Sequence, residues 1–499
     1  MRAATLPETT SGPTGHPATA GTSAFTRHPG RWIDGWDPEN AAQWDHGGGA
    51  RIARRNLAIS VFAEFLGFGV FALWAIVVPQ LKSYGYVGSA ALSETQQFWL
   101  LSIPTLVGAS LRIPYTLAVP RFGGRNWTVV SALLLLIPTT GLALAVAHRA
   151  SFGILLVMAA LAGFGGGNFA SSMTNISFFY RHAEKGKALG FNAAGGNLGT
   201  AAVQFSIPFV VTIGAAGAGG TGAPNLPLAG WILVPLILLA AALAFVRMDN
   251  LTVASPEAAR RRRGAEVTVG SDEGAGNDRT SFAMAARARH TWILSFLYVG
   301  SFGSFIGFAG VFPKIMSDAF PAHGLKLAFL GALVGSLTRP LGGIVADRVG
   351  GWKVTVVSFL AMALGAYGAI TALQAKNFAL FLATFLLLFV FTGVGNGSIY
   401  RMIPAVFNAS ATDHSPTGQA VTKRVAAGAI GVVGAIGAFG GFVIPQGFAQ
   451  SKTHTISPAH PTGTIVPALA VIIGIYLVMA AVTWFAYGRK GSSLKGARI

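Results

Sequence analysis

The sequence contains no cysteine and few charged residues. Only 11% of its 499 residues are Asp, Glu, Lys or Arg, whereas ordinary soluble domains carry about 25%. Without cysteine, the chain has no disulfide framework and no thiolate metal site. Its ten histidines show no metal-ligand pattern, and it has no phosphate-binding loop of the GxxxxGK(S/T) type. We therefore expect no bound metal, no cofactor, no enzyme activity and no ATP-driven step.

Long apolar runs dominate what the sequence does contain. Hydrophobic residues make up 52% of the chain, and many runs reach the roughly 20 residues needed to cross a bilayer. These runs predict an all-α polytopic membrane protein with about twelve transmembrane helices. The expected spans are 57–81, 97–119, 128–147, 152–180, 188–213, 228–247, 290–313, 326–346, 354–373, 378–406, 424–449 and 465–487.

The formal net charge of +19 comes from basic residues in short loops between the apolar runs. This distribution indicates membrane topology and contact with anionic lipid, and it argues against nucleic-acid binding. The opposite loops carry isolated charges such as Lys82 and Lys452. Because basic loops face the cytoplasm, both termini are expected there, with the chain in the cell membrane. The basic loops contain Arg51, Arg54 and Arg55; Arg121 and Arg125; Arg181, Lys185 and Lys187; Arg348 and Lys353; Lys423 and Arg424; and Arg489 and Lys490.

Composition divides the chain into five parts. Residues 1–56 are expected to form a cytoplasmic tail that is largely disordered, because Met1 to Pro29 is rich in Thr, Ala, Gly and Pro. The segment Trp32 to Trp44 either lies at the membrane interface or packs loosely in that tail. The polar stretch 248–289, with its arginine run 260–263, is predicted to be a cytoplasmic linker. It separates six spans in 57–247 from six in 290–487, and a second cytoplasmic tail covers 488–499.

The two groups of six spans repeat in the same orientation. Arg112 precedes RFGGRNWTVV, and Arg339 precedes DRVGGWKVTVV at one constant offset. Two parallel six-helix halves are the architecture of major facilitator transporters, whose site lies near the membrane midplane between the halves. Three glycines of the fourth span also match three of the tenth: Gly163, Gly165 and Gly167 match Gly393, Gly395 and Gly397.

One loop carries a motif of its own. GGIVADRVGGWK (342–353) resembles the loop between the second and third helices of each half in the major facilitator superfamily, whereas the first-half copy, PRFGGRN, lacks the aspartate. Asp347 and Arg348 are predicted to form the charge contact that latches an inner gate; the alternative is a solvated loop pair. Arg401, near the cytoplasmic end of the tenth span, is expected to snorkel or gate, not to bind a second anion.

The run 163–199 is unusually rich in Gly, Ala, Ser and Asn on either side of a short basic turn. In a membrane, small residues let helix backbones approach closely, and Asn or Ser can face a polar cavity. The run therefore predicts two helices pressed together around something polar. The glycines assigned to this packing are Gly163, Gly165, Gly166, Gly167, Gly195 and Gly196, together with the matching Gly393, Gly395 and Gly397.

Arg112 and Arg339 lie inside apolar spans at matching positions of the two halves. An arginine in mid-membrane costs roughly 2.5–3.5 kcal/mol on insertion scales, so such residues usually serve function. Two guanidiniums without obvious acids at the same depth indicate an anion site, and their planar forks suit a planar oxyanion. The alternative is that a carboxylate or a helix C-terminus neutralises each arginine elsewhere.

The stretch GGGNFASSMTNISFFY…KGKALGFNAAGGNLG resembles the signature of the nitrate/nitrite porter family, the NarK group of major facilitators. The resemblance implies that Arg112 and Arg339 clamp the anion and that Asn197, in GGNLG, bonds to the substrate. It also implies that Phe169, in NFASSM, is an aromatic wall. In the seventh span, YVGSF implies a hydroxyl contact from Tyr298 and a second wall from Phe302.

Glu64 lies early in the first span, among phenylalanines. A carboxyl group in such a setting is a candidate for proton uptake, which would couple anion movement to proton movement. The alternative is a salt bridge to Arg54, Arg55 or another basic residue near the inner surface. The two interpretations stay open at the level of sequence.

These features together favour a monomeric secondary transporter of nitrate and/or nitrite that works by alternating access. Glu64 favours proton-coupled nitrate uptake. Nitrate/nitrite antiport is the alternative, because an empty site with two unpaired arginines would resist closing. More distant alternatives are a porter for another small inorganic anion and an anion sensor, although a sensor would be expected to carry a folded output domain.

Overall fold

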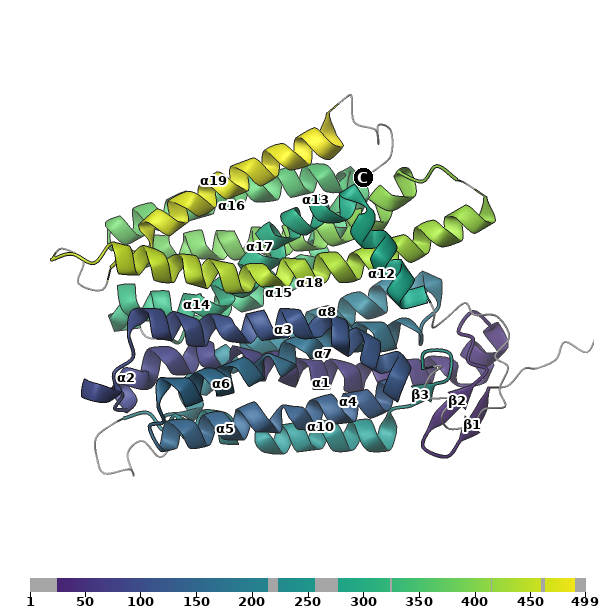
Figure 1. Cartoon of the computed structure of the whole chain (residues 1–499), viewed down its shortest axis with the longest axis horizontal. Coiled ribbons are helices and arrows are strands. Elements are labelled where there is room, and N and C mark those ends of the chain that lie inside the picture. Colours follow the sequence, from purple (N-terminus) through teal and green to yellow (C-terminus); the bar gives the residue numbers. More distant parts are fainter. Residues whose placement is uncertain are drawn as a thin grey trace, which may run out of the picture.

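The computed structural model describes residues 25–213, 223–255, 277–323, 325–413, 415–458 and 463–489. The arginine run 260–263, most of the stretch from Met1 to Pro29 and nearly all of the tail 488–499 lie outside these ranges. Within them the chain forms two groups of long helices that lie side by side, with a small sheet at one end (Figure 1). We call that end the sheet end and the other the opposite end.

The first group corresponds to the first predicted half, and the second group to the second. The first comprises α1 (Gly49–Val77), the short α2 (Leu81–Tyr84), α3 (Glu94–Phe122), α4 (Gly124–Leu134), α5 (Leu136–Ala147), α6 (Phe152–Ala162), α7 (Phe164–Ser177), α8 (His182–Val210), α9 (Pro227–Trp231) and α10 (Val234–Arg247). The second comprises α12 (Asn277–Arg287), α13 (Arg289–Tyr298), the π-helical turn η4 (Val299–Gly303), α14 (Ser304–Ala319), α15 (Phe329–Val349), α16 (Gly351–Gln374), α17 (Phe378–Ala409), α18 (Pro416–His454), α19 (Val466–Thr483) and the π-helical turn η6 (Trp484–Gly488).

Eleven of the helices in the described ranges, counting consecutive segments as one, are long and apolar enough to cross a membrane. α8 has the length, at 29 residues, but glycines, asparagines and other small or polar residues lower its hydropathy. It packs beside α1 and α15. With α8 included, the described helices supply the twelve spans that the sequence predicts.

The predicted internal repeat appears in the backbone where α3 meets α4 and where α15 meets α16. Gly123 ends α3 with a φ of +93°, and Gly350 ends α15 with a φ of +98°. L-residues with a side chain rarely adopt this conformation, so glycine is the residue that fits the turn. The same strained turn at matched positions supports two parallel halves built on one plan.

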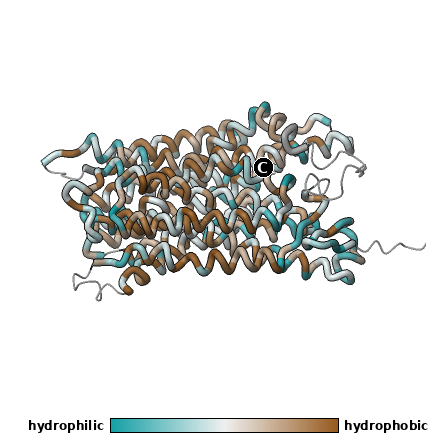
Figure 2. Tube along the Cα trace, turned by 60° about the horizontal axis from the view of Figure 1, so that its bottom comes forward, coloured by the Kyte–Doolittle hydropathy of each residue, from teal (hydrophilic) through white to brown (hydrophobic). Residues whose placement is uncertain are grey.

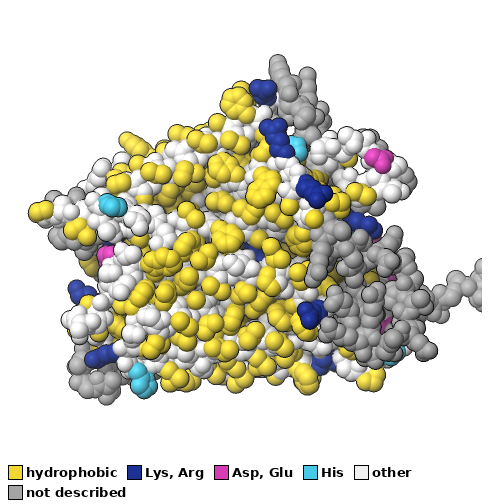
Figure 3. Space-filling model, in the orientation of Figure 1, with side chains coloured by type: hydrophobic (Ala, Val, Ile, Leu, Met, Phe, Trp, Pro, Cys, Tyr) yellow, Lys and Arg dark blue, Asp and Glu magenta, His cyan; other side chains and the backbone are white. Residues whose placement is uncertain are grey.

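The outer flanks of the bundle are apolar. Figure 2 shows hydrophobic residues along the middle of the helices and hydrophilic ones at both ends, and Figure 3 shows one face covered mostly by hydrophobic side chains. Large side chains such as Val471, Leu364 and Phe209 are well exposed on these flanks. Soluble monomers rarely expose so much contiguous apolar surface, and a lipid bilayer accounts for it.

Residues 25–48 are folded, so the prediction of a loosely packed tail is wrong for this part. β1 (Thr26–His28) pairs antiparallel with β2 (Trp32–Asp34), and β2 pairs parallel with β3 (Asn250–Leu251), which follows α10. Beyond β2, Trp36 and Trp44 are buried, with Trp36 5.8 Å from Phe179 and Trp44 5.7 Å from Tyr180 between ring centroids. The tryptophans therefore pack in a protein core at the sheet end and do not lie at a membrane interface.

The three-stranded sheet and residues 25–48 together form a cap on the sheet end of the bundle. Asp249 joins this cap to the helices. Its buried carboxylate accepts from Arg31 at 2.9 Å and pairs with Arg55 of α1, and its backbone N–H donates to Asn56 at 2.8 Å. The neighbouring Asn250 side chain accepts from the backbone N–H of Arg125, at the start of α4. The expected linker 248–289 thus begins as part of the cap and ends as helix α12.

Candidate functional site

α7 and α8, the two helices of the small-residue run, both press against α1. A Cβ atom on Gly165 would collide with the backbone of Gly67, and one on Gly199 with the backbone of Phe65. The predicted close approach of backbones is therefore present, but α8 makes it chiefly with α1, and α7 makes it with both α1 and α3. The polar feature enclosed by these helices is Glu64 of α1.

The other glycines of the predicted set also lie at crowded positions. A Cβ on Gly163 would lie 2.8 Å from the backbone nitrogen of Gly108 in α3, and one on Gly166 would lie 3.0 Å from its Cα. In the second half, Gly397 faces the carbonyl of Arg339, so α15 and α17 approach closely next to that arginine. Further contacts of this kind join Gly167 to Tyr115, Gly195 to Val61, Gly393 to Gly335 and Gly395 to Ser358.

Arg112 of α3 lies between two aromatic rings contributed by the two halves. Its guanidinium carbon is 4.8 Å from the ring centroid of Phe169 on α7 and 4.9 Å from that of Phe302 in η4. Arg112 also donates to the carbonyl of Gly434 on α18, at 2.9 Å. The residue is buried, so this cation is held by ring faces and one carbonyl within the bundle.

Arg339 of α15 faces the same two rings. Its guanidinium carbon lies 5.9 Å from Phe169 and 5.5 Å from Phe302. It donates to the Tyr298 hydroxyl at 3.2 Å, and that hydroxyl in turn donates to Asn396 at 2.9 Å. The structure thus brings together Arg112, Arg339, Phe169, Phe302 and Tyr298, which the sequence placed on separate spans.

Two buried N–H groups of this cluster have no hydrogen-bond partner among the described residues. They are Nε of Arg112 and Nη1 of Arg339. Neither arginine forms a salt bridge with a described carboxylate. Buried donors without partners are costly, and two of them on facing cations provide a site where a small oxyanion can accept hydrogen bonds.

Asn197 is buried on α8, and its side-chain oxygen has no hydrogen-bond partner among the described residues. It follows Gly196, where an added Cβ would collide with the Glu64 side chain. No described contact joins Asn197 to either arginine, so its substrate contact stays a prediction.

Glu64 lies in the bundle core and does not pair with Arg54 or Arg55. Its Oε2 accepts hydrogen bonds from the Ser172 hydroxyl of α7 and, at 2.7 Å, from the Asn192 amide of α8. Its Oε1 is buried and has no partner among the described residues. Arg112 and Arg339 lie close enough to interact electrostatically with the carboxyl group. The predicted alternative of an inner-surface salt bridge is therefore wrong, since Arg55 pairs with Asp249 instead.

Asp347 forms its ion pair with Arg401, not with the adjacent Arg348 as predicted. Neighbouring residues on a helix point about 100° apart, so Asp347 on α15 reaches across to α17 more readily than to the next side chain. Both partners are about half exposed. The sequence motif located the aspartate but pointed to the wrong partner, although Arg401 was singled out separately as a snorkelling or gating residue.

The comparisons with known proteins agree with this architecture. The family model described as the Major Facilitator Superfamily matches residues 57–445. The chain is 37% identical to the nitrate/nitrite transporter NarU of Escherichia coli, over 92% of this chain and 97% of that one. It is 33% identical to the probable nitrate/nitrite antiporter NarK2 of Thermus thermophilus, over 93% and 98% of the two chains. The chain belongs to the Major Facilitator Superfamily and, within it, to the family of these nitrate/nitrite transporters.

Solved structures of the superfamily share the fold at low sequence identity. A crystal structure of the D-xylose-proton symporter aligns with a TM-score of 0.63 and 15% identity, covering 90% of this chain and all of the other. A partially occluded inward-open form of the xylose transporter XylE from E. coli aligns with a TM-score of 0.62 at 14% identity. These likenesses establish the major facilitator fold of the bundle.

Three residues of this major facilitator site escaped the sequence reasoning. The Tyr400 ring lies 5.7 Å from the Arg339 guanidinium carbon, Asn396 accepts from Tyr298, and Phe68 packs edge-on against Phe169 at 6.1 Å. The internal repeat could have found two of them, because Asn396 and Tyr400 lie in the tenth-span segment that matches the fourth-span signature. Phe68 carries no comparable signal, since phenylalanines are common throughout the spans.

Proposed function

We propose that this chain is a secondary transporter of nitrate and nitrite whose two central arginines clamp the anion. The supporting observation is that Arg112 and Arg339, one from each half, face the same two phenylalanine rings and retain buried N–H groups without partners. A planar oxyanion accepts from two guanidinium forks and fits between two ring faces. The relatives named as nitrate/nitrite transporters point to the same substrates.

In this proposal Phe169 and Phe302 are the walls of the site. Tyr298, for which the resemblance implies a hydroxyl contact with the substrate, also orients Arg339. Asn197 supplies a further hydrogen bond to the anion. Transport proceeds by rocking of the two halves around the site, with the close-packed glycines allowing α1, α7 and α8 to move against one another. Asp347 and its neighbour Arg348 lie at the sheet end and belong to the gate on that side. The protein works as a monomer in the cell membrane, with the basic sheet end and both termini in the cytoplasm.

Glu64 supports coupling of nitrate uptake to protons. The carboxyl group is fully enclosed between α1, α7 and α8, and it lies within electrostatic reach of both arginines. When an anion neutralises part of the arginine charge, the carboxylate loses some of its electrostatic stabilisation and binds a proton more readily. Anion and proton binding would then favour each other, which is the requirement for symport.

A specific observation also favours antiport. The two guanidiniums have no acidic hydrogen-bond partner among the described residues, so the empty site keeps two facing cations. Like charges in a low-dielectric site repel strongly, and this repulsion opposes return of the unloaded transporter. A carrier that returns only when loaded exchanges one anion for another, and the Thermus thermophilus relative is named a probable antiporter.

One experiment separates these modes. The purified chain is reconstituted in liposomes, and nitrate uptake is measured with an inward proton gradient and then with nitrite loaded inside. If transport is symport, the proton gradient should stimulate nitrate uptake, and Glu64→Gln should abolish this stimulation. Glu184→Gln, at an exposed position, is the matched control and should leave the stimulation intact. Stimulation by internal nitrite alone contradicts symport and establishes exchange.

The same liposomes test the substrate assignment. Uptake of neither nitrate nor nitrite under either condition contradicts the proposal and leaves another small inorganic anion as the substrate. Binding of nitrate without uptake would instead favour a sensor.

A further inference from the structure

Four charged side chains form one cluster at the opposite end of the bundle. Lys314 Nζ on α14 lies 3.3 Å from Glu94 Oε1 on α3 and 3.0 Å from Asp318 Oδ2 on α14. Lys452 Nζ on α18 lies 2.8 Å from Glu94 Oε2 and 2.6 Å from Asp318 Oδ2. Each lysine therefore bridges both acids, and the expectation that Lys452 is an isolated loop charge is wrong.

The two lysines are buried and the two acids are not. Lys314 is 2% exposed and Lys452 is 4% exposed, whereas the Glu94 and Asp318 side chains are 24% and 32% exposed. Both ammonium groups also face the ring of Phe98, at 5.7 and 6.0 Å. A buried lysine is costly unless it is paired, so the cluster depends on keeping both acids in place.

The four residues are divided unequally between the halves. Glu94 alone comes from the first half, while Lys314, Asp318 and Lys452 come from the second. With the halves in contact, two lysines balance two acids. If the halves part at this end, Glu94 leaves with its own half, and the second half keeps two lysines with one aspartate. Opening thus converts a neutral cluster into a mouth with net positive charge.

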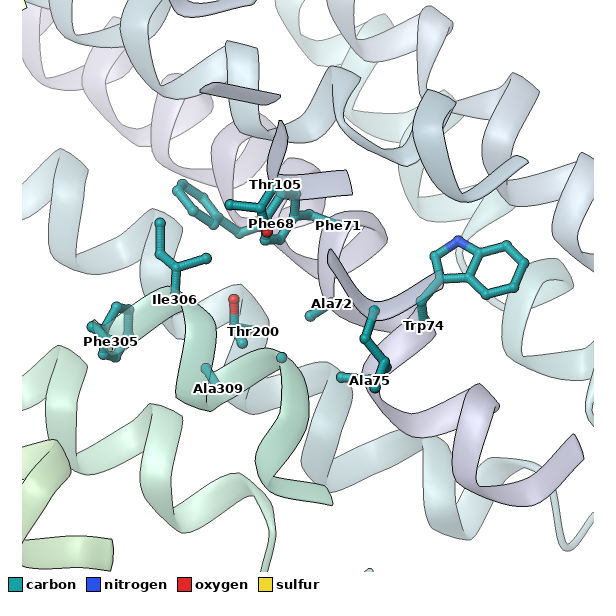
Figure 4. Close-up of a pocket in the computed structure, with 12 residues that line it drawn as sticks. Phe68, Phe71, Ala72, Trp74, Ala75, Thr105, Thr200, Phe305, Ile306 and Ala309 are labelled. Atoms are coloured by element: carbon teal, nitrogen blue, oxygen red, sulfur yellow. The ribbon is translucent and has the colours of Figure 1, made fainter. Parts of the chain in front are cut away.

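The cluster covers the route from the opposite end to the arginines. Along α3, Glu94 lies roughly 27 Å from Arg112 at 1.5 Å per residue. Between them a small cavity of about 20 Å³ lies at the junction of the halves, lined by Leu101 and Thr105 from one half and by Phe305, Ile306 and Ala309 from the other (Figure 4). A cavity of this size holds about one water molecule, so the passage is closed here.

Other contacts between the halves close the same segment. Thr95 and Thr453 hydroxyls lie 3.3 Å apart, and Gln446 of α18 donates to Ser102 of α3 at 2.7 Å. Gln204 of α8 donates to the Ala309 carbonyl of α14, also at 2.7 Å. Among these contacts between the halves, those of Glu94 with Lys314 and Lys452 are the ionic ones, and they lie nearest to the opposite end of the bundle.

We propose that the cluster is an anion-binding site whose positive charge Glu94 masks while this end of the bundle is closed. In the closed state Glu94 pairs with the two lysines and acts as a latch between the halves. When this end opens, a small oxyanion takes the place of the Glu94 carboxylate. Lys314 and Lys452 are the residues that receive the anion. The identity of that anion as nitrate or nitrite rests on the proposed function, whereas the latch and the unmasking of positive charge do not. Reclosing returns Glu94 to the lysines and releases the anion toward Arg112.

Cysteine accessibility tests the latch directly, because the chain has no cysteine of its own. Thr105→Cys places one thiol in the cavity behind the cluster. In intact cells, with reagent added outside, Glu94→Gln is expected to raise the rate of thiol modification by about tenfold, since it removes the ionic tie between the halves. Asp318→Asn is the matched control: it removes one acid of the same cluster but cuts no contact between halves, so modification is expected to be no faster.

Two reagents of opposite charge test the unmasking. In the Glu94→Gln background, a sulfonate-bearing methanethiosulfonate is expected to react several-fold faster than a trimethylammonium-bearing one, and added salt should reduce the difference. Adding Lys314→Gln and Lys452→Gln should abolish this preference, whereas Lys82→Gln, an exposed lysine at the same end, should leave it unchanged.

Three outcomes overturn the proposal. They are equal modification rates with and without Glu94, no modification from outside in any variant, or an anion preference that survives loss of both lysines. If Glu94→Gln does not reach the membrane, Glu94→Asp and Lys452→Gln each weaken the same tie and must give the faster modification. Because thiol modification needs no transported anion, failure here leaves nitrate transport standing, and failure of nitrate transport leaves the latch testable.

Discussion

Arg112 and Arg339 face the ring of Phe302 from opposite halves, with guanidinium carbons 4.9 and 5.5 Å from its centroid. One aromatic ring thus lies against two like charges that repel each other. The negative faces of Phe302 and Phe169 stabilise each buried cation without neutralising it. An anion that binds here supplies the missing negative charge and finds both cations already in position.

Replacing Phe302 by leucine is expected to weaken nitrate binding. The substitution keeps apolar volume but removes a ring face whose cation–π attraction stabilises each guanidinium by about 0.5–2 kcal/mol. The KM for nitrate uptake in proteoliposomes should rise by about tenfold, since 1.4 kcal/mol corresponds to a factor of ten. Phe209→Leu, on an exposed flank of α8, is the control and should not change KM. An unchanged KM for Phe302→Leu would contradict a role of the Phe302 ring in nitrate binding.

Two glycines of α8 should respond in opposite ways to the same methyl group. Gly199→Ala forces a Cβ into the backbone of Phe65, and overpacking of this kind costs about 1–3 kcal/mol. Its thermal unfolding temperature and nitrate uptake should both fall. Gly190 has open space at its Cβ position, so Gly190→Ala should be neutral or slightly stabilising, because alanine favours helix by about 1 kcal/mol. Equal effects at both positions would contradict the packing role.

The cap at the sheet end should depend on Asp249. Asp249→Ala leaves Arg31 and Arg55 without their shared buried acceptor. Because both arginine side chains are partly exposed, we expect a loss of about 1–3 kcal/mol rather than the larger cost of a fully buried pair. Thermal unfolding of the purified protein in detergent measures this loss. Asp45→Ala is the control, because it removes an exposed partner of Arg181 and should lower stability by less than about 1 kcal/mol. A similar loss of stability in both variants would mean that the cap does not stabilise the bundle.

Apolar run length and the internal repeat predicted the bundle and the two arginines of the candidate site, whereas Phe169, Asn197, Tyr298 and Phe302 were expected only from the resemblance to the nitrate/nitrite porter family. Arg112 and Arg339 could be paired from sequence because the repeat gives them equivalent positions, and an arginine inside an apolar span has few structural reasons to be there. The glycine-rich run predicted close helix contacts. It could not identify the helices that they approach, because small residues permit an approach without specifying the partner, and those partners proved to be α1 and α3.

Contacts between distant segments were the part that the sequence did not reveal. Trp36 and Trp44 looked like interfacial residues, yet they pack on Phe179 and Tyr180, more than a hundred residues away. Lys452 looked solitary because its partners, Glu94 and Asp318, lie on other helices. Spacing along one helix predicts a face, whereas ion pairs across helices depend on how the helices are arranged.

The most direct test of the central claim is a double-mutant cycle on nitrate affinity with Arg112→Lys and Arg339→Lys, measured as nitrate-dependent stabilisation of the purified protein. Each lysine keeps the charge but loses the planar fork, so each single variant should weaken binding by about 10- to 100-fold, as expected for charge-assisted hydrogen bonds worth about 1.5–3 kcal/mol. If both arginines hold one anion, the double variant should lose much less than the product of the two single losses, because the second substitution acts on a site already disrupted. Fully multiplicative losses, or nitrate binding that survives both substitutions, would contradict the shared clamp.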